Sequence, residues 1–229
     1  MYQTEFAGQH YELGTSGFLY RSNKLMYDHG TESMWSTLQG EPVVGPLVGK
    51  GIKLERGHVV TTTWGEWKNQ HPDTLVLSLD TGHDRDYGEG VAYKEYFSND
   101  KLMFQVTQRD DRLKNKDQVV ALRDDTEQLA VAAKFLNENP VYHDQLGEKR
   151  FVILTTAGGA NRVYESGQHQ FVQWNGTDQV TDDQGKVWQV TEQAITQNET
   201  RLDRMPSHRA FWFGWYAQFP NTRLVGSDK

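Results

Sequence analysis

The sequence predicts a β-rich α+β protein made of two similar lobes that arose from an internal duplication. The first observation is a stretch that occurs twice, at residues 64–76 and 212–225, in which Trp-x-x-Trp is followed by Gln, an aromatic ring, Pro, Asp or Asn, and Thr. The two copies keep one offset of 148 residues, from 64 to 212, 67 to 215 and 72 to 220. Tryptophan and proline are rare residues, so a chance recurrence at fixed spacing is not expected.

The second observation is another pair of similar segments that lies in the same order. Residues 26–35 resemble residues 180–188, and each segment is predicted to be a strand, a turn with an acidic residue and a glycine, and then a tryptophan. The offset here is 153, from Trp35 to Trp188, so a small gap separates this match from the first one. The third observation is a series of short apolar segments between Gly-containing turns, which is typical of β structure.

Each copy of the Trp-x-x-Trp stretch predicts a short helix, a turn and a strand. Thr63 and Glu66 have the spacing of a capping box at a helix start. Indoles three residues apart lie on one helical face, and the proline that follows ends the helix. The apolar run 75–79 predicts a buried strand after the first helix.

In the first lobe, residues 1–112, the elements are predicted from short apolar runs. Residues 1–20 predict a hairpin that enters a sheet, residues 25–28 a strand, and residues 41–51 turn-rich β structure. The polar, Gly-containing loop 80–90 follows the strand at 75–79. The charged run 109–117 predicts a solvated linker at the lobe boundary.

In the second lobe, residues 113–229, apolar runs predict strands at 119–122, 151–155, 171–174 and 187–190. Residues 126–139 predict a helix that ends before Pro140, and the polar run 191–203 predicts an exposed segment. Subtracting the offset of 153 puts the counterparts of the elements up to residue 155 before residue 3, since 155 − 153 = 2. We therefore expect the first lobe to be N-terminally incomplete, with Met1 an internal methionine or a late start, and residues 1–20 poorly packed or paired with another chain.

Composition excludes several classes of protein. The net charge of −7 argues against a nucleic-acid partner, because phosphate neutralisation requires clustered Lys and Arg. No segment approaches the roughly twenty apolar residues of a membrane span, and no signal peptide is present in this chain. The absence of Cys excludes disulfides, thiol catalysis and cysteine-bound metal in these residues.

The acidic loop is the candidate metal site. Asp80, Asp84, Asp86 and Glu89 carry the oxygen ligands that a hard divalent cation such as Ca²⁺ prefers. The alternative is a surface loop in which Arg85 neutralises the acids. Asp80-Thr-Gly is also the local signature of an aspartic protease, an enzyme that needs two carboxylates; the offset of 148 puts Asp228 opposite Asp80, but the sequence around Asp228 is not a second Asp-Thr-Gly.

A second set of candidates combines aromatic, acidic and imidazole groups from the repeated segments. The indoles can form an aromatic wall for a ligand, although packing of a helix on its sheet is the more common role of such residues. His208 precedes the second Trp-x-x-Trp helix and is the histidine nearest to it. The candidate ligand-binding residues are Asp28, Glu32, Trp35, His208, Trp212 and Trp215.

Several long segments resemble one family, called domain of unknown function 3179. They are residues 17–28, 31–35, 40–49, 63–76, 80–88 and 208–217, so the resemblance covers nearly the whole chain. It implies a mostly extracytoplasmic bacterial or archaeal protein without an assigned activity. Members of the family usually carry a Cys-Pro-x-Cys strand just before the segment where this chain starts, and a His-Glu pair further upstream; this sequence has neither.

Taken together, the residues and the resemblance predict an extracytoplasmic ligand- or metal-binding module without demonstrated catalysis, with any site between the lobes. The alternative is an enzyme, either metal-dependent or an aspartic-type hydrolase that uses Asp80. No catalytic residue and no cofactor is identified beyond a candidate divalent cation.

Overall fold

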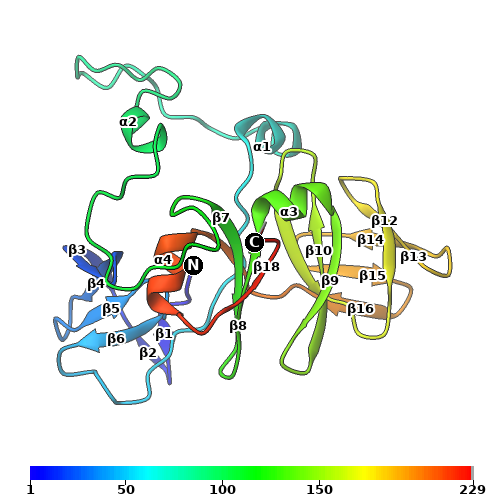
Figure 1. The fold of residues 1–229 in the computed structure, drawn as a ribbon, viewed down its shortest axis with the longest axis horizontal. Helices are drawn as coiled ribbons and strands as arrows, with labels where there is room; N and C mark the ends of the chain where they lie inside the picture. Colours follow the sequence, from blue (N-terminus) through cyan, green and yellow to red (C-terminus); the bar gives the residue numbers. More distant parts are fainter. Residues whose placement is uncertain (228–229) are drawn as a thin grey trace.

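The computed structural model describes residues 1–227 and is β-rich, with 37% strand and 11% helix. Figure 1 shows three regions: an N-terminal sheet on the left, a central sheet under α4, and two further sheets on the right. A long arm, residues 64–105, arches over this body and carries α1 (Trp64–Gln70) and α2 (Lys94–Phe97). The β-rich α+β class predicted from the sequence is confirmed.

The N-terminal sheet is an antiparallel meander in the order β3-β4-β5-β6. Its strands are Leu13–Tyr20, Asn23–Asp28, Met34–Ser36 and Glu41–Val44, and a small hairpin of β1 (Glu5–Phe6) and β2 (Gln9–His10) precedes it. The hairpin expected in residues 1–20 and the strand expected at 25–28 are therefore confirmed. A small core lies beneath the sheet, and its buried members are Tyr11, Trp35, Leu47, Ile52 and Leu54.

The central sheet has the order β17-β7-β8-β18. β7 (Gln118–Arg123) and β8 (Gln128–Ala132) form an antiparallel hairpin. β17 (His208–Phe211) pairs antiparallel with β7, and β18 (Arg223–Val225) pairs parallel with β8. The helix α4 (Trp212–Gln218) connects the two outer strands, so that one β-α-β unit holds the hairpin from both sides.

The predicted helix at 126–139 is wrong over its first half. Residues 128–132 form β8, and only Ala133–Glu138 form a helix, α3. Leu129 and Val131 face one buried cluster while Ala130 faces another. A strand that is buried on both faces shows no polar alternation, so its pattern cannot be distinguished from that of a buried helix segment.

Two antiparallel sheets complete the second lobe. β9 (Val141–Leu146), β10 (Lys149–Thr155) and β11 (Asn161–Glu165) form one of them. β12 (Phe171–Trp174), β13 (Gln179–Asp182), β14 (Val187–Val190), β15 (Ala194–Gln197) and β16 (Thr200–Asp203) form a meander. The segment 191–203 is exposed over most of its length, as predicted, but it forms β15 and β16, and Ala194 and Ile195 are buried.

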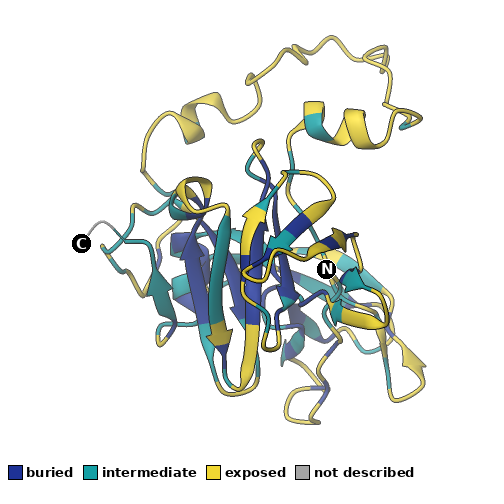
Figure 2. Ribbon diagram, turned by 90° about the vertical axis from the view of Figure 1, so that its right-hand side faces the viewer, coloured by how far each residue is buried: buried dark blue, intermediate teal, exposed yellow. Residues whose placement is uncertain are grey.

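The arm differs from the body in its exposure. Figure 2 shows the buried residues gathered in the strands of the body, while the arm at the top is exposed over most of its length. The strand predicted at 75–79 does not form, and Leu75 and Leu77 are 96% and 93% exposed. The apolar run has the pattern of a buried strand, but among the described residues no strand pairs with this segment.

The helices α1 and α4 nevertheless have the same local geometry. Both are seven residues long, and their C-caps, His71 and Phe219, have φ/ψ values of −132°/69° and −131°/71°. In each, the second indole donates a hydrogen bond to the threonine seven residues later, at 2.9 Å from Trp67 and 3.0 Å from Trp215. The helix and the turn are therefore as predicted in both copies, and the strand that follows is present only in the second.

Candidate functional site

A small, partly open cavity of about 90 Å³ lies where the N-terminal sheet meets the central sheet. Tyr2, Thr37 and Arg56 line it from the N-terminal side. Ser207 and His208 line it from the start of β17. The site is thus built from residues that are far apart in the sequence, and we call it the His208 cavity.

His208 is fixed on β17 opposite Ala121 of β7, with its ring 5.6 Å from that of Trp215. Its Nε2 atom is enclosed and has no hydrogen-bond partner among the described residues. Burial, followed by the positive charges of the N-terminal amine, Arg123 and Arg56, lowers the pKa of His208 to about 4. The imidazole is therefore neutral at pH 7, and its Nε2 forms no hydrogen bond within the described residues.

Two guanidinium groups make the surroundings of the cavity cationic. Arg56 donates to the backbone oxygen of Arg123 at 2.6 Å, and Arg123 donates to the backbone oxygen of Gln39 at 2.5 Å. Burial and repulsion from Arg123 lower the pKa of Arg56. Within residues 1–227 neither guanidinium forms an ion pair, and Asp124 and Asp125 act on Arg56 only through space. Both side chains are half-buried, and partly desolvated cations without a paired carboxylate favour binding of an anion.

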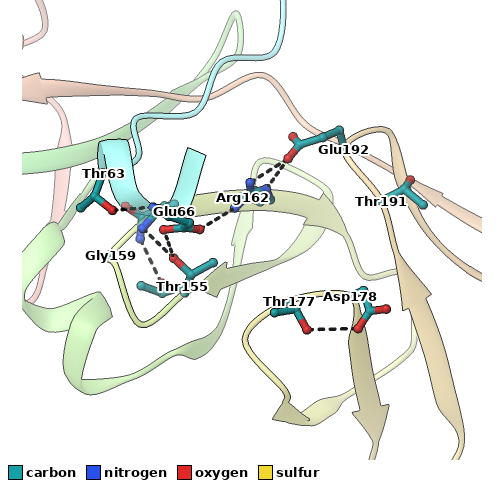
Figure 3. Close-up of polar contacts among 12 residues, drawn as sticks. Thr63, Glu66, Thr155, Gly159, Arg162, Thr177, Asp178, Thr191 and Glu192 are labelled. Atoms are coloured by element: carbon teal, nitrogen blue, oxygen red, sulfur yellow. Dashed lines mark hydrogen bonds and ion pairs between the residues drawn. The ribbon is translucent and has the colours of Figure 1, made fainter. Parts of the chain in front are cut away.

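A second polar cluster joins the arm to the second lobe, and Figure 3 shows it around Glu66 of α1. Thr63 caps the helix, and Thr156 donates to Glu66 at 3.0 Å. Arg162 lies 4.0 Å from Glu66 and 2.7 Å from Glu192. Arg204 also contacts Glu192.

The charges of this cluster balance one another. Burial opposes ionisation of Glu192, but hydrogen bonding to Arg162 and the charges of Arg162 and Arg204 hold the pKa of this carboxyl below its usual range. Two acids and two arginines balance in charge, although Glu66 Oε1 and Arg204 Nε have no hydrogen-bond partner in the described chain. The cluster therefore attaches α1 to the body and carries no net charge.

A wider hollow of about 520 Å³ lies on the second lobe beside β9 and β18. Its central charges are also paired: Arg223 contacts Asp144 at 2.8 Å and Glu127 at 2.9 Å, and Tyr142 donates to Asp144 at 2.6 Å. These contacts attach β18 to its neighbours. At the His208 cavity, by contrast, the half-buried Arg56 and Arg123 have no ion-pair partner within residues 1–227.

The candidate ligand-binding residues fall into two separate groups. Asp28 and Trp35 are buried at the β4–β5 turn, where Glu32 is exposed. The other group, His208, Trp212 and Trp215, lies on β17 and α4. Both indoles of that group pack in a core cluster. Only His208 contributes to the cavity, and ligand binding by the others stays a prediction.

The candidate metal ligands Asp80, Asp84, Asp86 and Glu89 are all exposed on the arm. Asp86 accepts a hydrogen bond from the amide of Gly88 at 2.8 Å. Within residues 1–227 no three His, Cys, Asp or Glu side chains are gathered as metal ligands. Cation binding by this loop stays a prediction, and Asp228, the counterpart of Asp80 in the aspartic-type alternative, lies outside the described residues.

The sequence interpretation did not identify Tyr2, Arg56 or Arg123 as site residues. One signal was present: Arg56 and Arg204 are 148 residues apart, the offset of the Trp-x-x-Trp copies.

Comparison with known proteins gives one result. The family model described as "Protein of unknown function (DUF3179)" matches residues 1–222. No curated protein and no solved structure matches. Among the described residues, no helix is long and apolar enough to cross a membrane.

Proposed function

The chain belongs to the DUF3179 family, and we propose that it is a non-catalytic binding module that takes a small anionic group, such as a carboxylate or a phosphate, in the His208 cavity. The observation that carries the proposal is the enclosed Nε2 of His208 beside two guanidinium groups without ion pairs in the described part of the chain. An anion there accepts one hydrogen bond, from Nε2 of the imidazole in its neutral Nε2–H tautomer, and offsets the repulsion between Arg56 and Arg123.

The proposal includes an internal duplication, with lobes at residues 1–112 and 113–229, so that the cavity lies between two copies of one unit. The cross-strand pairs support it. Trp35 faces Met26 across β4 and β5, and Trp188 faces Val180 across β13 and β14. Each tryptophan also has an aromatic ring within about 5 Å, from Tyr11 at 5.1 Å and from His169 at 4.5 Å.

The acidic turns of the two meanders give further support. Asp28 and Asp182 are each 3% exposed. The amide of Asp28 donates to the backbone oxygen of Ser33 at 3.0 Å, and the amide of Asp182 donates to that of Lys186 at 3.0 Å. Both carboxylates accept amide hydrogen bonds from their own turns.

A tyrosine–arginine bridge is a third similarity. Tyr2 forms an antiparallel bridge to Arg56, and Tyr164 forms one to Arg204. Each tyrosine hydroxyl donates to a backbone oxygen, and the acceptors are Leu38 at 2.8 Å and Thr191 at 2.7 Å. These acceptors are 153 residues apart, as are Trp35 and Trp188.

Anion binding is tested by thermal melting of the whole chain at pH 7 with acetate, succinate, inorganic phosphate or sulfate, at constant ionic strength. We expect at least one of them to raise Tm for the wild type and not for Arg123→Gln. The matched control is Arg150→Gln, which removes an exposed arginine and should keep the full shift. Equal shifts for the wild type and Arg123→Gln with all four anions would disprove the proposal.

We also propose an extracytoplasmic location. Its support is the family resemblance of the segments named above. Fractionation of the source cells with an antibody against the native protein tests it, and recovery with the cytoplasmic fraction would contradict it.

A further inference from the structure

The second lobe contains a complete example of a strand-helix-strand unit holding a hairpin. β17 pairs with β7 from His208 opposite Ala121 to Phe211 opposite Gln118. β18 pairs with β8 from Arg223 opposite Leu129 to Val225 opposite Val131. α4 bridges the outer strands, and its indoles are buried on small side chains of the hairpin: Val119, Ala121 and Ala130.

The arm contains a second unit of this kind without a hairpin. With the offset of 148, residues 60–63 correspond to β17 and residues 75–77 to β18. Neither segment is a strand in the structure, although α1 and its turn match α4 and its turn in length, cap angles and indole hydrogen bond. The folded connector is therefore present, while both outer strands lack their partners.

The exposed fractions of its apolar side chains show that the unit on the arm lacks a packing partner. Trp212 and Trp215 are 1% and 0% exposed, whereas Trp64 and Trp67 are 53% and 37% exposed. Val76 is also 69% exposed, beside the still more exposed Leu75 and Leu77. A contiguous apolar segment with free backbone groups marks a surface for strand pairing.

We propose that the unit formed by residues 60–77 binds an antiparallel β-hairpin whose small apolar side chains pack under Trp64 and Trp67. One hairpin strand pairs antiparallel with residues 60–63, and the other pairs parallel with residues 75–77. In the second lobe the hairpin precedes β11, whose Tyr164 corresponds to Tyr2 in the proposed duplication. The occupant is therefore a two-stranded antiparallel hairpin with small apolar side chains, of the kind that β7 and β8 form under α4.

A second copy of the chain fits this surface less well. Its β7–β8 hairpin already has β17 on one side and β18 on the other, so neither edge is free to receive residues 60–63 or 75–77. A single strand would leave one of the two segments without a partner, because the complete unit in the second lobe holds two strands.

The inference rests on the duplication in the proposed function, and it is tested by a chimera. Residues 116–163 are placed before Tyr2 of the whole chain, so that Tyr2 follows the added segment in the place of Tyr164. We expect hydrogen exchange at residues 60–63 and 75–77 to slow roughly tenfold or more, since backbone hydrogen bonds formed in a sheet open only through unfolding. We also expect the emission of Trp64 and Trp67 to shift to the blue.

The matched control is the same chimera with Ala121→Asp and Ala130→Asp in the added copy only, which puts carboxylates under the indoles and should abolish the protection. If the added strands are protected while residues 60–63 and 75–77 exchange as fast as in the unmodified chain, the inference is wrong. It is also wrong if the unmodified chain sediments as a dimer with residues 75–77 protected, because the occupant is then a second copy.

A second variant covers the case in which the added segment does not fold. Residues 64–77, with Glu66→Gly to match Gly214, replace residues 212–225, which are equal in length. The inference expects the grafted unit to dock on β7–β8 with both indoles buried, and a graft that also carries Leu75→Asp and Leu77→Asp to fail. A folded first graft whose indoles stay exposed overturns the inference. The anion-binding test of the proposed function uses the chain without added or grafted segments. Its failure can therefore be distinguished from a failure of the hairpin proposal.

Discussion

The helices α1 and α4 have nearly the same local structure in two different surroundings. Their lengths, cap angles and indole-to-threonine hydrogen bonds agree. One lies against a hairpin and has fully buried indoles, while the other lies on an arm and exposes both of its indoles. The comparison shows that the local sequence determines the helix and its turn, whereas the strand that should follow needs a neighbour for its backbone groups.

The largest expected difference between the lobes is in hydrogen exchange. Amides of β7, β8 and β10 lie in strands with buried side chains on both faces, so they should exchange only through global unfolding. Amides of the arm and of β1–β3 should exchange through local opening, several kcal/mol below the global value. Mass-spectrometric exchange of the monomer measures this, and equal protection of both lobes, residues 1–20 included, would contradict it.

The next test compares two tryptophans. Trp215→Ala should destabilise the protein by about 3–5 kcal/mol, because a fully buried indole leaves a cavity in the core. Trp67→Ala should cost about 1 kcal/mol or less, because its indole is already partly in water and has few packing neighbours to lose. Urea unfolding of both variants measures the difference. Similar losses would mean that α1 is packed in solution.

The sequence predicted some elements and missed others for identifiable reasons. The strands at 25–28 and 187–190 and both Trp-x-x-Trp helices follow from local patterns. β8 was assigned to a helix because both of its faces are buried. The run 75–79 was assigned to a strand that has no partner among the described residues.

The candidate site was harder to predict than the fold. His208 was identified because it adjoins a repeated motif, but Arg56 and Arg123 come from segments that only the fold brings together. An arginine in a sequence is most often a solvated surface residue. That Arg56 and Arg123 are half-buried without an ion pair depends on tertiary contacts, and no local sequence pattern records such contacts.

A third test compares the acidic turns. Asp182 accepts hydrogen bonds from two turn amides and, at 3.0 Å, from the buried indole Nε1 of Trp188. Asp28 also accepts from two turn amides, but its third donor is the part-buried hydroxyl of Thr31, and the Nε1 of Trp35 has no partner in the described chain. Asp182→Ala should therefore cost about 2–3 kcal/mol, since charged hydrogen bonds are lost and buried donors are left unpaired. Asp28→Ala should cost less by about 1 kcal/mol. Denaturant unfolding checks the order, and a larger loss for Asp28→Ala would refute it.

The pH dependence of stability distinguishes His208 from its counterpart in the first lobe, which is Val60. Because the folded pKa of His208, about 4, lies below the ordinary value of 6.5, the unfolded chain binds the proton more tightly. This stability is present above pH 6.5 and is lost as the pH falls from 6.5 to about 4, by about 3 kcal/mol.

His208→Gln should flatten the stability curve over that interval. His10→Gln, which changes an exposed histidine, should leave the slope as in the wild type. Urea unfolding at steps between pH 4 and 7 measures both, and an unchanged slope in His208→Gln would show that the imidazole is not buried in its neutral form.

The smallest expected effect is that of calcium on the acidic loop of the arm, because the loop is exposed and bears little on the stability of the body. Like charges at Asp80, Asp84, Asp86 and Glu89 repel one another, and a divalent cation that binds their oxygens would order the loop. We expect millimolar Ca²⁺ to slow exchange of the loop amides while Tm of the body rises by no more than about 1 °C, since the free energy of local ordering adds little to global unfolding.

The control is Asp84→Asn with Asp86→Asn, which keeps the size of both side chains and removes their charge. If calcium leaves exchange in the loop unchanged at low ionic strength, the loop binds no calcium, and the alternative in which Arg85 neutralises the acids is favoured.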